Sequence, residues 1–145
     1  GKPLILNPAP AIPLPASLRE RVALLTPNEH ELAILSSGNS DAWREQLAAH
    51  PGRVLMTRGS DGAWFAGNDG TLQHQPSFKV EAVDTTGAGD TFNGALAAFW
   101  GDDLADVARM ACAAGALSVT RSGAQGGMPT REELTHFLGA RQRVE

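Results

Sequence analysis

The fold is decided by the stretch Asp84-Thr85-Thr86-Gly87-Ala88-Gly89-Asp90-Thr91-Phe92-Asn93-Gly94. Downstream of it, large apolar residues recur at three- and four-residue spacing, which predicts a helix over Thr91–Trp100. Upstream, the mostly apolar residues 80–83 indicate a strand or its exit. Gly87 and Gly89 allow backbone conformations that are closed to other residues, and they let a ligand approach without a Cβ in the way. A strand, a glycine loop and a helix start are therefore expected to follow one another.

The chemistry of this loop depends on the first turn of the predicted helix. A helix N-terminus carries roughly half a positive charge, and its unpaired N–H groups form a natural site for a phosphate or an oxyanion. Asp90 stands at the mouth of that site. The residues leave two roles open for its side chain, which can cap the helix with a contribution of about 1 kcal/mol or act as a base beside a bound anion.

Two common glycine motifs are excluded by spacing. The dinucleotide-binding fingerprint requires Gly-x-Gly-x-x-Gly, but the third residue after Gly89 is Phe92 and the next glycine is Gly94. A P-loop ends in Gly-Lys-Ser or Gly-Lys-Thr, and the lysines of the chain are Lys2 and Lys79. The loop therefore belongs to neither class of nucleotide-binding site.

Five segments of the chain, in this order, resemble the ribokinase-like carbohydrate kinases. They are Asn7-Pro8-Ala9-Pro10, Thr26-Pro27-Asn28-Glu29-His30-Glu31, Thr57-Arg58-Gly59-Ser60-Asp61-Gly62, the loop Asp84–Asp90, and Thr120-Arg121-Ser122-Gly123-Ala124-Gln125. The resemblance implies an α/β fold with a mostly parallel sheet flanked by helices and a short antiparallel addition. It also implies that residues 1–145 are the C-terminal nucleotide-binding and catalytic-base part of a kinase domain. Since members of the family are about twice as long, the resemblance further implies that their N-terminal half and its lid are absent from this chain.

The resemblance assigns roles around the Asp84–Asp90 loop. It makes Asp90 the catalytic base that accepts the proton of the sugar hydroxyl, with the N–H groups of Gly87, Ala88 and Gly89 as the anion hole. It also implies a potassium site made by one carboxylate and several backbone carbonyls, from Asp84, Thr86, Ser118, Arg121 and Gly123. The residues alone leave Asp84 a second role, as the hydrogen-bond acceptor for N–H groups of its own loop.

The resemblance also implies a nucleotide site. Asn28 and Glu31, three residues apart and so on one helix face, would help to hold the Mg²⁺–phosphate assembly through water, with a solvated polar face as the alternative. The segment that would contact the phosphates and ribose of ATP is Thr57, Arg58, Gly59, Ser60, Asp61 and Gly62, although its composition is also that of an ordinary turn. Cys112 falls where an adenine contact is expected, but a lone Cys among alanines can equally be a small buried hydrophobe.

The start of the same predicted helix has a structural interpretation. Thr26 would be the N-cap, Pro27 would occupy the first turn and Glu29 would complete a capping box. This interpretation explains three residues and leaves Asn28 and Glu31 without a structural role.

From the resemblance we expect ATP-dependent transfer of a phosphoryl group to the 5-hydroxyl of ribose, with ATP, Mg²⁺ and K⁺ as cofactors. Two alternatives stay open: another sugar or nucleoside kinase of the same superfamily, and a noncatalytic ATP-binding module if this part acts alone. The expected partners are small molecules, the sugar and ATP, and a homodimer is possible in the full-length protein.

Composition narrows the classes of partner. A net charge of −4 and a pI near 5.5 argue against nucleic acid, which is bound through clustered Lys and Arg. The sequence has no leader-like segment and no apolar run near the ~20 residues of a membrane span. Together with the lone Cys112, these features favour a cytoplasmic protein. The four histidines are too dispersed for a metal motif.

Apolar runs alternate with turn signals along the first half, which is typical of a parallel sheet covered by helices. The expected elements are strand-like segments at Leu4–Leu6, Val22–Leu25 and Val54–Thr57, helices at Ser17–Arg21, Asn28–Leu35 and Asp41–Ala49, and antiparallel strands around Gly67–Gly70. The second half is expected to be helical through Val119, then a glycine-rich loop at Ser122–Met128, and a helix at Thr130–Phe137 that begins with a capping box.

Four motifs follow predicted strands, and they contain Asn7, Asn28, Thr57 and Asp84. In open α/β sheets, ligands bind beyond the carboxyl ends of the strands. We therefore expect one ligand site to gather all four.

Overall fold

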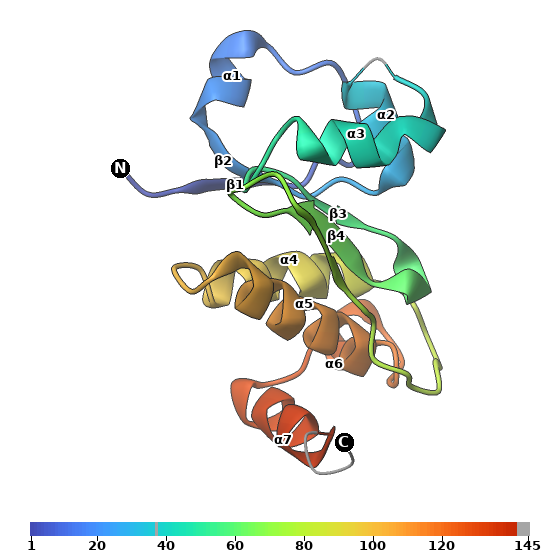
Figure 1. Ribbon diagram of the computed structural model, residues 1–145. Helices are drawn as coiled ribbons and strands as arrows, with labels where there is room; N and C mark the ends of the chain where they lie inside the picture. Colours follow the sequence, from blue (N-terminus) through green and yellow to red (C-terminus); the bar gives the residue numbers. More distant parts are fainter. Residues whose placement is uncertain (37, 142–145) are drawn as a thin grey trace. The chain divides into compact units, whose positions relative to one another are not determined.

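The computed structural model describes residues 1–36 and 38–141, and it consists of two compact units (Figure 1). The N-terminal unit is Gly1–Gln75 and the C-terminal unit begins at Pro76. Strands and helices alternate in the first unit, whereas the described elements of the second unit are helices. The expected α/β class is confirmed.

Every expected strand and helix of the first half is present in the N-terminal unit. The elements are, in chain order, β1 (Leu4–Leu6), α1 (Ala16–Arg21), β2 (Val22–Leu25), α2 (Glu29–Leu35), the 3₁₀ helix η1 (Ser40–Ala42), α3 (Trp43–Ala48), β3 (Leu55–Thr57), the 3₁₀ helix η2 (Gly59–Asp61), β4 (Ala63–Ala66) and β5 (Leu72–Gln75). Strand β1 pairs in parallel with β2, and parallel bridges join Leu25 to Val54 and Asn28 to Thr57 at the two ends of β3.

The antiparallel addition is a hairpin on the far edge of β3. Strand β4 pairs antiparallel with β3, and β5 pairs antiparallel with β4. The turn between them is closed by backbone hydrogen bonds from the Gly67 N–H to the Thr71 carbonyl at 2.9 Å and from the Gly70 N–H to the Gly67 carbonyl at 2.8 Å. Gly70 has a φ of 79°, in the left-handed region that glycine adopts without strain. The turn signals of the sequence therefore located this hairpin correctly.

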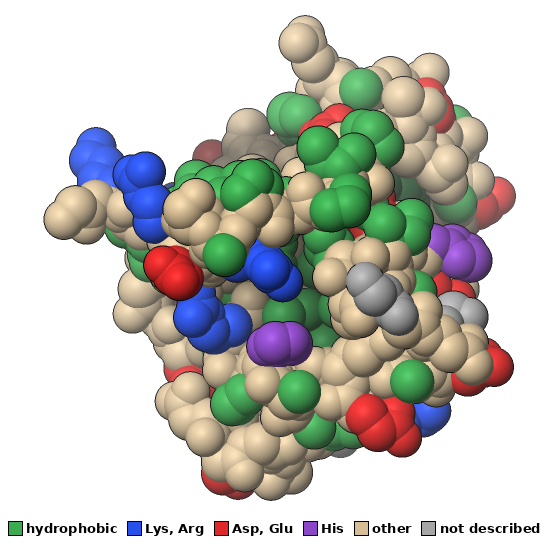
Figure 2. Space-filling model, turned by 90° about the horizontal axis from the view of Figure 1, so that it is seen from above, with side chains coloured by type: hydrophobic (Ala, Val, Ile, Leu, Met, Phe, Trp, Pro, Cys, Tyr) green, Lys and Arg blue, Asp and Glu red, His purple; other side chains and the backbone are tan. Residues whose placement is uncertain are grey.

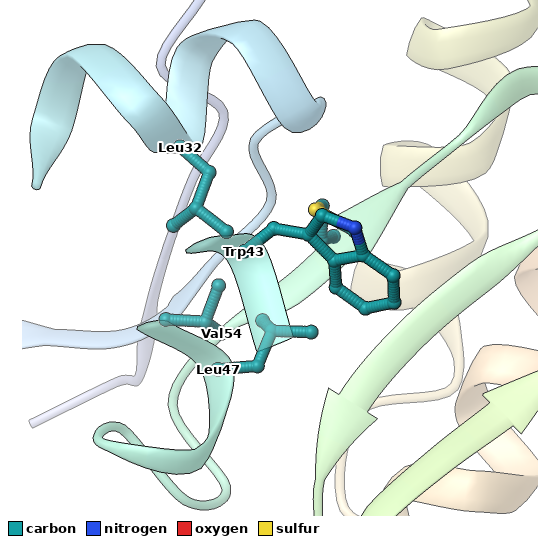
Figure 3. Packing of buried hydrophobic residues seen from close by; sticks show 5 residues of the cluster. Leu32, Trp43, Leu47 and Val54 are labelled. Atoms are coloured by element: carbon teal, nitrogen blue, oxygen red, sulfur yellow. The ribbon is translucent and has the colours of Figure 1, made fainter. Parts of the chain in front are cut away.

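The core of the N-terminal unit lies between the strands and helices α2 and α3. Its buried cluster is Leu32, Trp43, Leu47, Val54 and Met56 (Figure 3). Burying one such side chain contributes about 1.5–3 kcal/mol relative to leaving it exposed. This packing fixes the strands, and with them the loops that follow their carboxyl ends.

The C-terminal unit is helical. Its elements are α4 (Ala88–Ala98), α5 (Leu104–Ser118), α6 (Ala124–Gly127) and α7 (Arg131–Arg141). Helix α5 packs against α4 and α7, and its buried face is rich in alanine, which permits close approach between helices. The predicted capping box of the last helix is confirmed. The Thr130 hydroxyl accepts from the Glu133 N–H at 3.2 Å, and the Glu133 carboxylate accepts from the Thr130 N–H at 2.8 Å.

Three expectations for the second half were wrong. Residues 80–83 form no strand in the described structure, because the N–H groups of Val83 and Asp84 both donate to the Val119 carbonyl, at 2.7 and 3.1 Å. The helix expected to start at Thr91 already begins at Ala88. The stretch expected to be a glycine-rich loop contains the short helix α6.

Candidate functional site

The loop before α4 is shaped by Gly87. This residue is the N-cap of α4 and has a φ of 78°, in the left-handed region. A Cβ at this position would lie 2.8 Å from the Ala124 Cβ and 2.9 Å from the Ala124 Cα. Only glycine meets both conditions, so Gly87 is required by the chain itself.

Gly89 differs from Gly87, and the expectation that both need special backbone conformations was wrong for it. Gly89 is the second residue of α4 and its φ lies outside the left-handed region. A Cβ built on it would meet nothing within 4 Å. Neither the backbone nor the packing of the described chain requires glycine here, although glycine in a helix costs roughly 1 kcal/mol relative to alanine. The outer side of this turn is open to an approaching atom.

The free N–H groups of this turn belong partly to other residues than expected. Ala88 donates its N–H to the Thr85 carbonyl at 3.3 Å, and the first full helical bond runs from the Thr91 N–H to the Gly87 carbonyl at 2.9 Å. Within the described chain, the N–H groups of Gly87 and Gly89, both expected in the anion hole, and that of Asp90 make no hydrogen bond. They are the unpaired donors of a helix N-terminus, where anions are favoured.

Asp90 is the third residue of α4 and is exposed. Because Gly87 is the N-cap, the alternative that the Asp90 side chain caps the helix was wrong. Its carboxylate has no hydrogen bond or ion pair with any described residue. A free carboxylate thus stands beside free N–H donors in one helical turn.

Asp84 joins the loop before α4 to the residue before α6 by two hydrogen bonds. Its Oδ1 accepts from the Thr86 N–H at 2.9 Å and its Oδ2 accepts from the Gly123 N–H at 2.8 Å. The hydrogen bonds from Gly123 and Thr86 lower the pKa of Asp84 to about 2. The role left open for Asp84, an acceptor for the N–H groups of its own loop, is therefore present, and the carboxylate also fixes the segment before α6.

The predicted potassium ligands fit a cation only in part. Among the described residues, the carbonyls of Thr86 and Arg121 accept no hydrogen bond, whereas the Ser118 carbonyl accepts from the Arg121 N–H at 3.4 Å and the Gly123 carbonyl accepts from the Gly127 N–H at 2.8 Å. A hard cation takes such carboxylate and carbonyl oxygens. No three His, Cys, Asp or Glu side chains gather as a metal site in residues 1–36 and 38–141.

The segment that follows α5 and contains Arg121 is also fixed by an ion pair, which the sequence did not reveal. The Arg121 Nη2 donates to the Glu133 Oε1 at 2.7 Å. Arg121, together with the Thr130 N–H, lowers the pKa of Glu133 to about 2. Glu133 thereby joins the start of α7 to the segment that carries the predicted carbonyls.

In the N-terminal unit, the expected cap of α2 was wrong. Asn28, not Thr26, is the N-cap: the Asn28 Oδ1 accepts from the Glu31 N–H at 2.9 Å, and the Glu31 Oε2 accepts from the Asn28 N–H at 2.8 Å. Thr26 is instead buried, and it accepts a hydrogen bond from the Asn7 side chain. Contrary to expectation, Asn28 and Glu31 therefore do have a structural role, as the two partners of the capping box.

Three of the four motifs meet at one edge of the N-terminal unit. Asn7 follows β1, Asn28 follows β2 and is bridged to Thr57 at the end of β3, and the Thr57 N–H donates to the Pro27 carbonyl at 2.9 Å. These three segments therefore lie together at the carboxyl ends of the strands, as expected, and their joining in one ligand site stays a prediction. The fourth motif, at Asp84, belongs to the other unit.

The Thr57–Gly62 segment forms a tight turn. Gly59 and Gly62 have φ values of 52° and 98°, and Gly59–Asp61 is a 3₁₀ helix. Gly59 and Ser60 are exposed. The side chains of Arg58 and Asp61 are instead paired with each other at 3.1 Å, so Gly59 and Ser60 are the residues of this turn left to face a ligand.

Cys112 lies on the buried face of α5 and is 6% exposed. Burial raises the pKa of its thiol to about 12. These properties favour the alternative of a small buried hydrophobe over an adenine contact.

Two general properties of the described chain are its surface charge and the lengths of its helices. Most of the Lys and Arg side chains visible in Figure 2 lie at the left of that face, with acidic and hydrophobic side chains among them. In the part of the chain that the structure describes, no helix has the length and apolar character needed to cross a bilayer.

Comparisons with known proteins give a consistent result. The family model described as pfkB family carbohydrate kinase matches residues 1–131. The chain is 48% identical to a ribokinase of Bacillus subtilis over 139 residues, which cover 94% of this chain and 46% of the relative. An Arabidopsis thaliana ribokinase complexed with ribose and ATP superposes with a TM-score of 0.81 at 31% identity, covering 94% of this chain and 47% of the other.

A structure of a putative ribokinase II from E. coli, in complex with ATP and Mg²⁺, has a TM-score of 0.71 at 32% identity and covers 86% of this chain and 41% of the other. The chain spans about half the length of the curated relatives it matches.

Proposed function

The chain belongs to the pfkB family of carbohydrate kinases, and on this premise we propose that it contributes to ATP-dependent transfer of a phosphoryl group to the 5-hydroxyl of ribose. One observation carries the proposal. The turn at Gly89 is open, has free N–H donors at Gly89 and Asp90, and presents an unpaired carboxylate at Asp90. A phosphoryl-transfer site needs these features, whereas the stability of the described chain does not explain them.

The residues of α4 would act in two ways. Phosphoryl transfer requires chiefly that the attacking and leaving oxygens be positioned and that charge on the moving group be stabilised. The N–H groups of Gly89 and Asp90 would stabilise that charge, and one preorganised donor of this kind is worth about 3 kcal/mol of barrier. The Asp90 carboxylate would accept the proton of the sugar hydroxyl as it attacks.

The N-terminal unit would hold the nucleotide. We assign the phosphates and ribose of ATP to the Thr57–Gly62 turn, because its residues Gly59 and Ser60 are exposed and glycine permits close approach. Mg²⁺ would neutralise phosphate charge and is bound in proteins through few carboxylates and several waters. The Glu31 Oε1 has no partner among the described residues, so it remains available for such water-mediated contact.

A monovalent cation is the third component of the proposal. Asp84 and the carbonyls of Thr86 and Arg121 would hold K⁺ beside the free N–H groups of α4, and its charge would add to the stabilisation of the phosphate. Support comes from the acceptors that the loop leaves unused. A cytoplasmic location and a homodimer of the full-length protein remain predictions.

The test of the base is Asp90→Asn in the full-length protein. We expect kcat to fall by about 10²–10⁴-fold, the range for general-base catalysis, while ATP binding measured by calorimetry is kept. Asp106→Asn is the matched control, because Asp106 is also the third residue of a helix in the same unit. Full turnover by Asp90→Asn would refute the assignment.

The length of the chain relative to its relatives favours a second candidate function. Because the chain spans about half of its curated relatives, a noncatalytic ATP-binding module is the alternative for the chain acting alone. ATP binding without ribose-dependent ADP release would support the module. A panel of ribose, deoxyribose, fructose and a nucleoside, offered to the full-length protein, would separate ribose from other substrates of the superfamily.

A further inference from the structure

The side chain of Arg58 contacts three other side chains of the N-terminal unit, those of Glu29, Asp61 and Trp43. Its Nε donates to the Glu29 Oε2 at 2.5 Å and its Nη1 donates to the Asp61 Oδ2 at 3.1 Å. Its Cζ lies 5.2 Å from the centre of the Trp43 ring, whose indole is part of the buried cluster. The guanidinium is thus neutralised by two carboxylates and rests on the core.

Asp61, the acidic partner inside the turn, is itself anchored to the hairpin. The Trp64 Nε1 donates to the Asp61 Oδ2 at 2.9 Å, and the His74 Nε2 lies 2.7 Å from the Asp61 carbonyl oxygen. The rings of Trp64 and His74 stack with centroids 4.1 Å apart. The hydrogen bond from Trp64 is the main cause that lowers the pKa of Asp61. One end of the 3₁₀ turn is therefore fixed to β4 and β5.

Glu29, the other acidic partner, is the first residue of α2. It directly follows Asn28, which is bridged to Thr57. The hydrogen bond to Glu29 is the main cause that raises the pKa of Arg58. Arg58 therefore joins the start of α2 to the turn after β3, the two segments of this unit to which the proposed function assigns the nucleotide.

We propose that Arg58 is a positioning residue of the nucleotide site: held between Glu29 and Asp61, it sets the spacing between the start of α2 and the backbone of the Gly59–Asp61 turn without contacting phosphate. The inference rests on the proposed function. It replaces the simpler expectation that an Arg in this segment is a direct phosphate ligand, because Glu29 and Asp61 already offset its positive charge and hold its Nε and Nη1.

The two roles predict opposite effects when a carboxylate is removed. If Arg58 bound phosphate, Glu29→Gln or Asp61→Asn would free its charge and remove a negative charge, so ATP would bind as tightly or more tightly. If Arg58 positions the segments, each change replaces a charged acceptor by a weaker neutral amide, so the link loosens and ATP binds more weakly. We expect a loss of about fivefold for each, the upper range for a partly exposed ion pair.

Substitution of Arg58 itself gives a second, independent contrast. Lysine is a good point-charge ligand of phosphate but has no planar fork with which to join two carboxylates. Under the positioning role, Arg58→Lys and Arg58→Met weaken ATP binding by similar factors. Under the ligand role, Arg58→Lys keeps most of the affinity and only Arg58→Met loses it.

The experiment is calorimetric titration of ATP with Mg²⁺ into the full-length protein and its variants, with the KM for ATP and kcat measured beside it. We expect the KM to rise with little change in kcat, and the pair Glu29→Gln with Arg58→Met to be non-additive. Asp69→Asn is the control for net charge, since Asp69 caps the β4–β5 turn through Thr71. Thermal unfolding run in parallel shows that each variant is folded at the assay temperature.

The outcomes separate the inference from the proposed function. Wild-type protein that binds no ATP overturns both. Wild-type protein that binds ATP, with equal or tighter binding by Glu29→Gln and Asp61→Asn, overturns the positioning role alone. Weaker binding by both carboxylate variants and by Arg58→Lys, with Asp69→Asn unchanged, supports it.

Discussion

Replacement of each of the two loop glycines by alanine should have opposite effects on stability. In Gly89→Ala the new methyl group meets nothing within 4 Å and the backbone is already helical, so the free energy of unfolding should rise by about 0.5–1 kcal/mol. In Gly87→Ala the left-handed conformation costs about 1–2 kcal/mol. The contact of 2.8 Å with the Ala124 Cβ adds about 1–3 kcal/mol more.

Activity should follow a different order from stability. The methyl group of Gly89→Ala would stand on the open side of the turn, where the moving phosphoryl group is proposed to lie. A displacement of about 1 Å there costs on the order of 10² in rate. Gly89→Ala should therefore be more stable than the wild type and nearly inactive, a combination that loss of folding does not produce.

Urea unfolding measures the stabilities, and a coupled ADP-release assay on the full-length protein measures the rates. Gly94→Ala is the matched control, because Gly94 lies in the same helix with open space around its Cβ position and outside the loop. It should gain stability and keep activity. Full activity of Gly89→Ala would refute the reasoning that this turn approaches a phosphoryl group. Strong destabilisation of Gly89→Ala would contradict the open space and the helical backbone at this position.

The remaining predictions concern Asp84 and Glu133. Both carboxyls have a folded-state pKa of about 2, below the ordinary value, so their contribution to stability is complete above about pH 5 and is lost as the pH falls toward 2. Acid unfolding of Asp84→Asn and Glu133→Gln should therefore show a weaker pH dependence than that of the wild type. Identical curves would contradict these pKa shifts. Exchange of K⁺ for a large organic cation should lower the activity of the wild type several-fold and leave the residual activity of Asp84→Asn unchanged, whereas a wild type indifferent to the exchange would argue against the cation site.

The regular elements of the first half could be predicted because their signals are local. The apolar run of β1 and the turn at Gly67–Gly70 each specify their structure within a few residues. The cap of α2 could not be predicted in the same way. Thr26 and Asn28 are both favoured N-cap residues, and only the distant contacts of Thr26 with Asn7 and the Leu6 carbonyl take it into the sheet.

The candidate site was predicted least well where it depends on non-local contacts. Arg58 and Glu29 are 29 positions apart, and no spacing rule pairs them. Helix α6 was missed because glycine-rich composition argues against a helix, although the hydrogen bond from the Gly123 N–H to Asp84 fixes its start. The resemblance predicted a free carboxylate at Asp90. The sequence did not predict that Asp90 is the third residue of α4, because the start of this helix is set by the backbone conformation of Gly87.

The contact between Gly87 and Ala124 also limits how this site can vary among related sequences. The two positions share one small volume, yet they are not interchangeable, because only position 87 has a left-handed backbone. Position 87 should therefore tolerate no side chain at all. Position 124 should accept glycine or serine as well as alanine, and a larger residue there would push the loop outward. A bulky residue at 124 in a related sequence would thus indicate a loop that follows a different path.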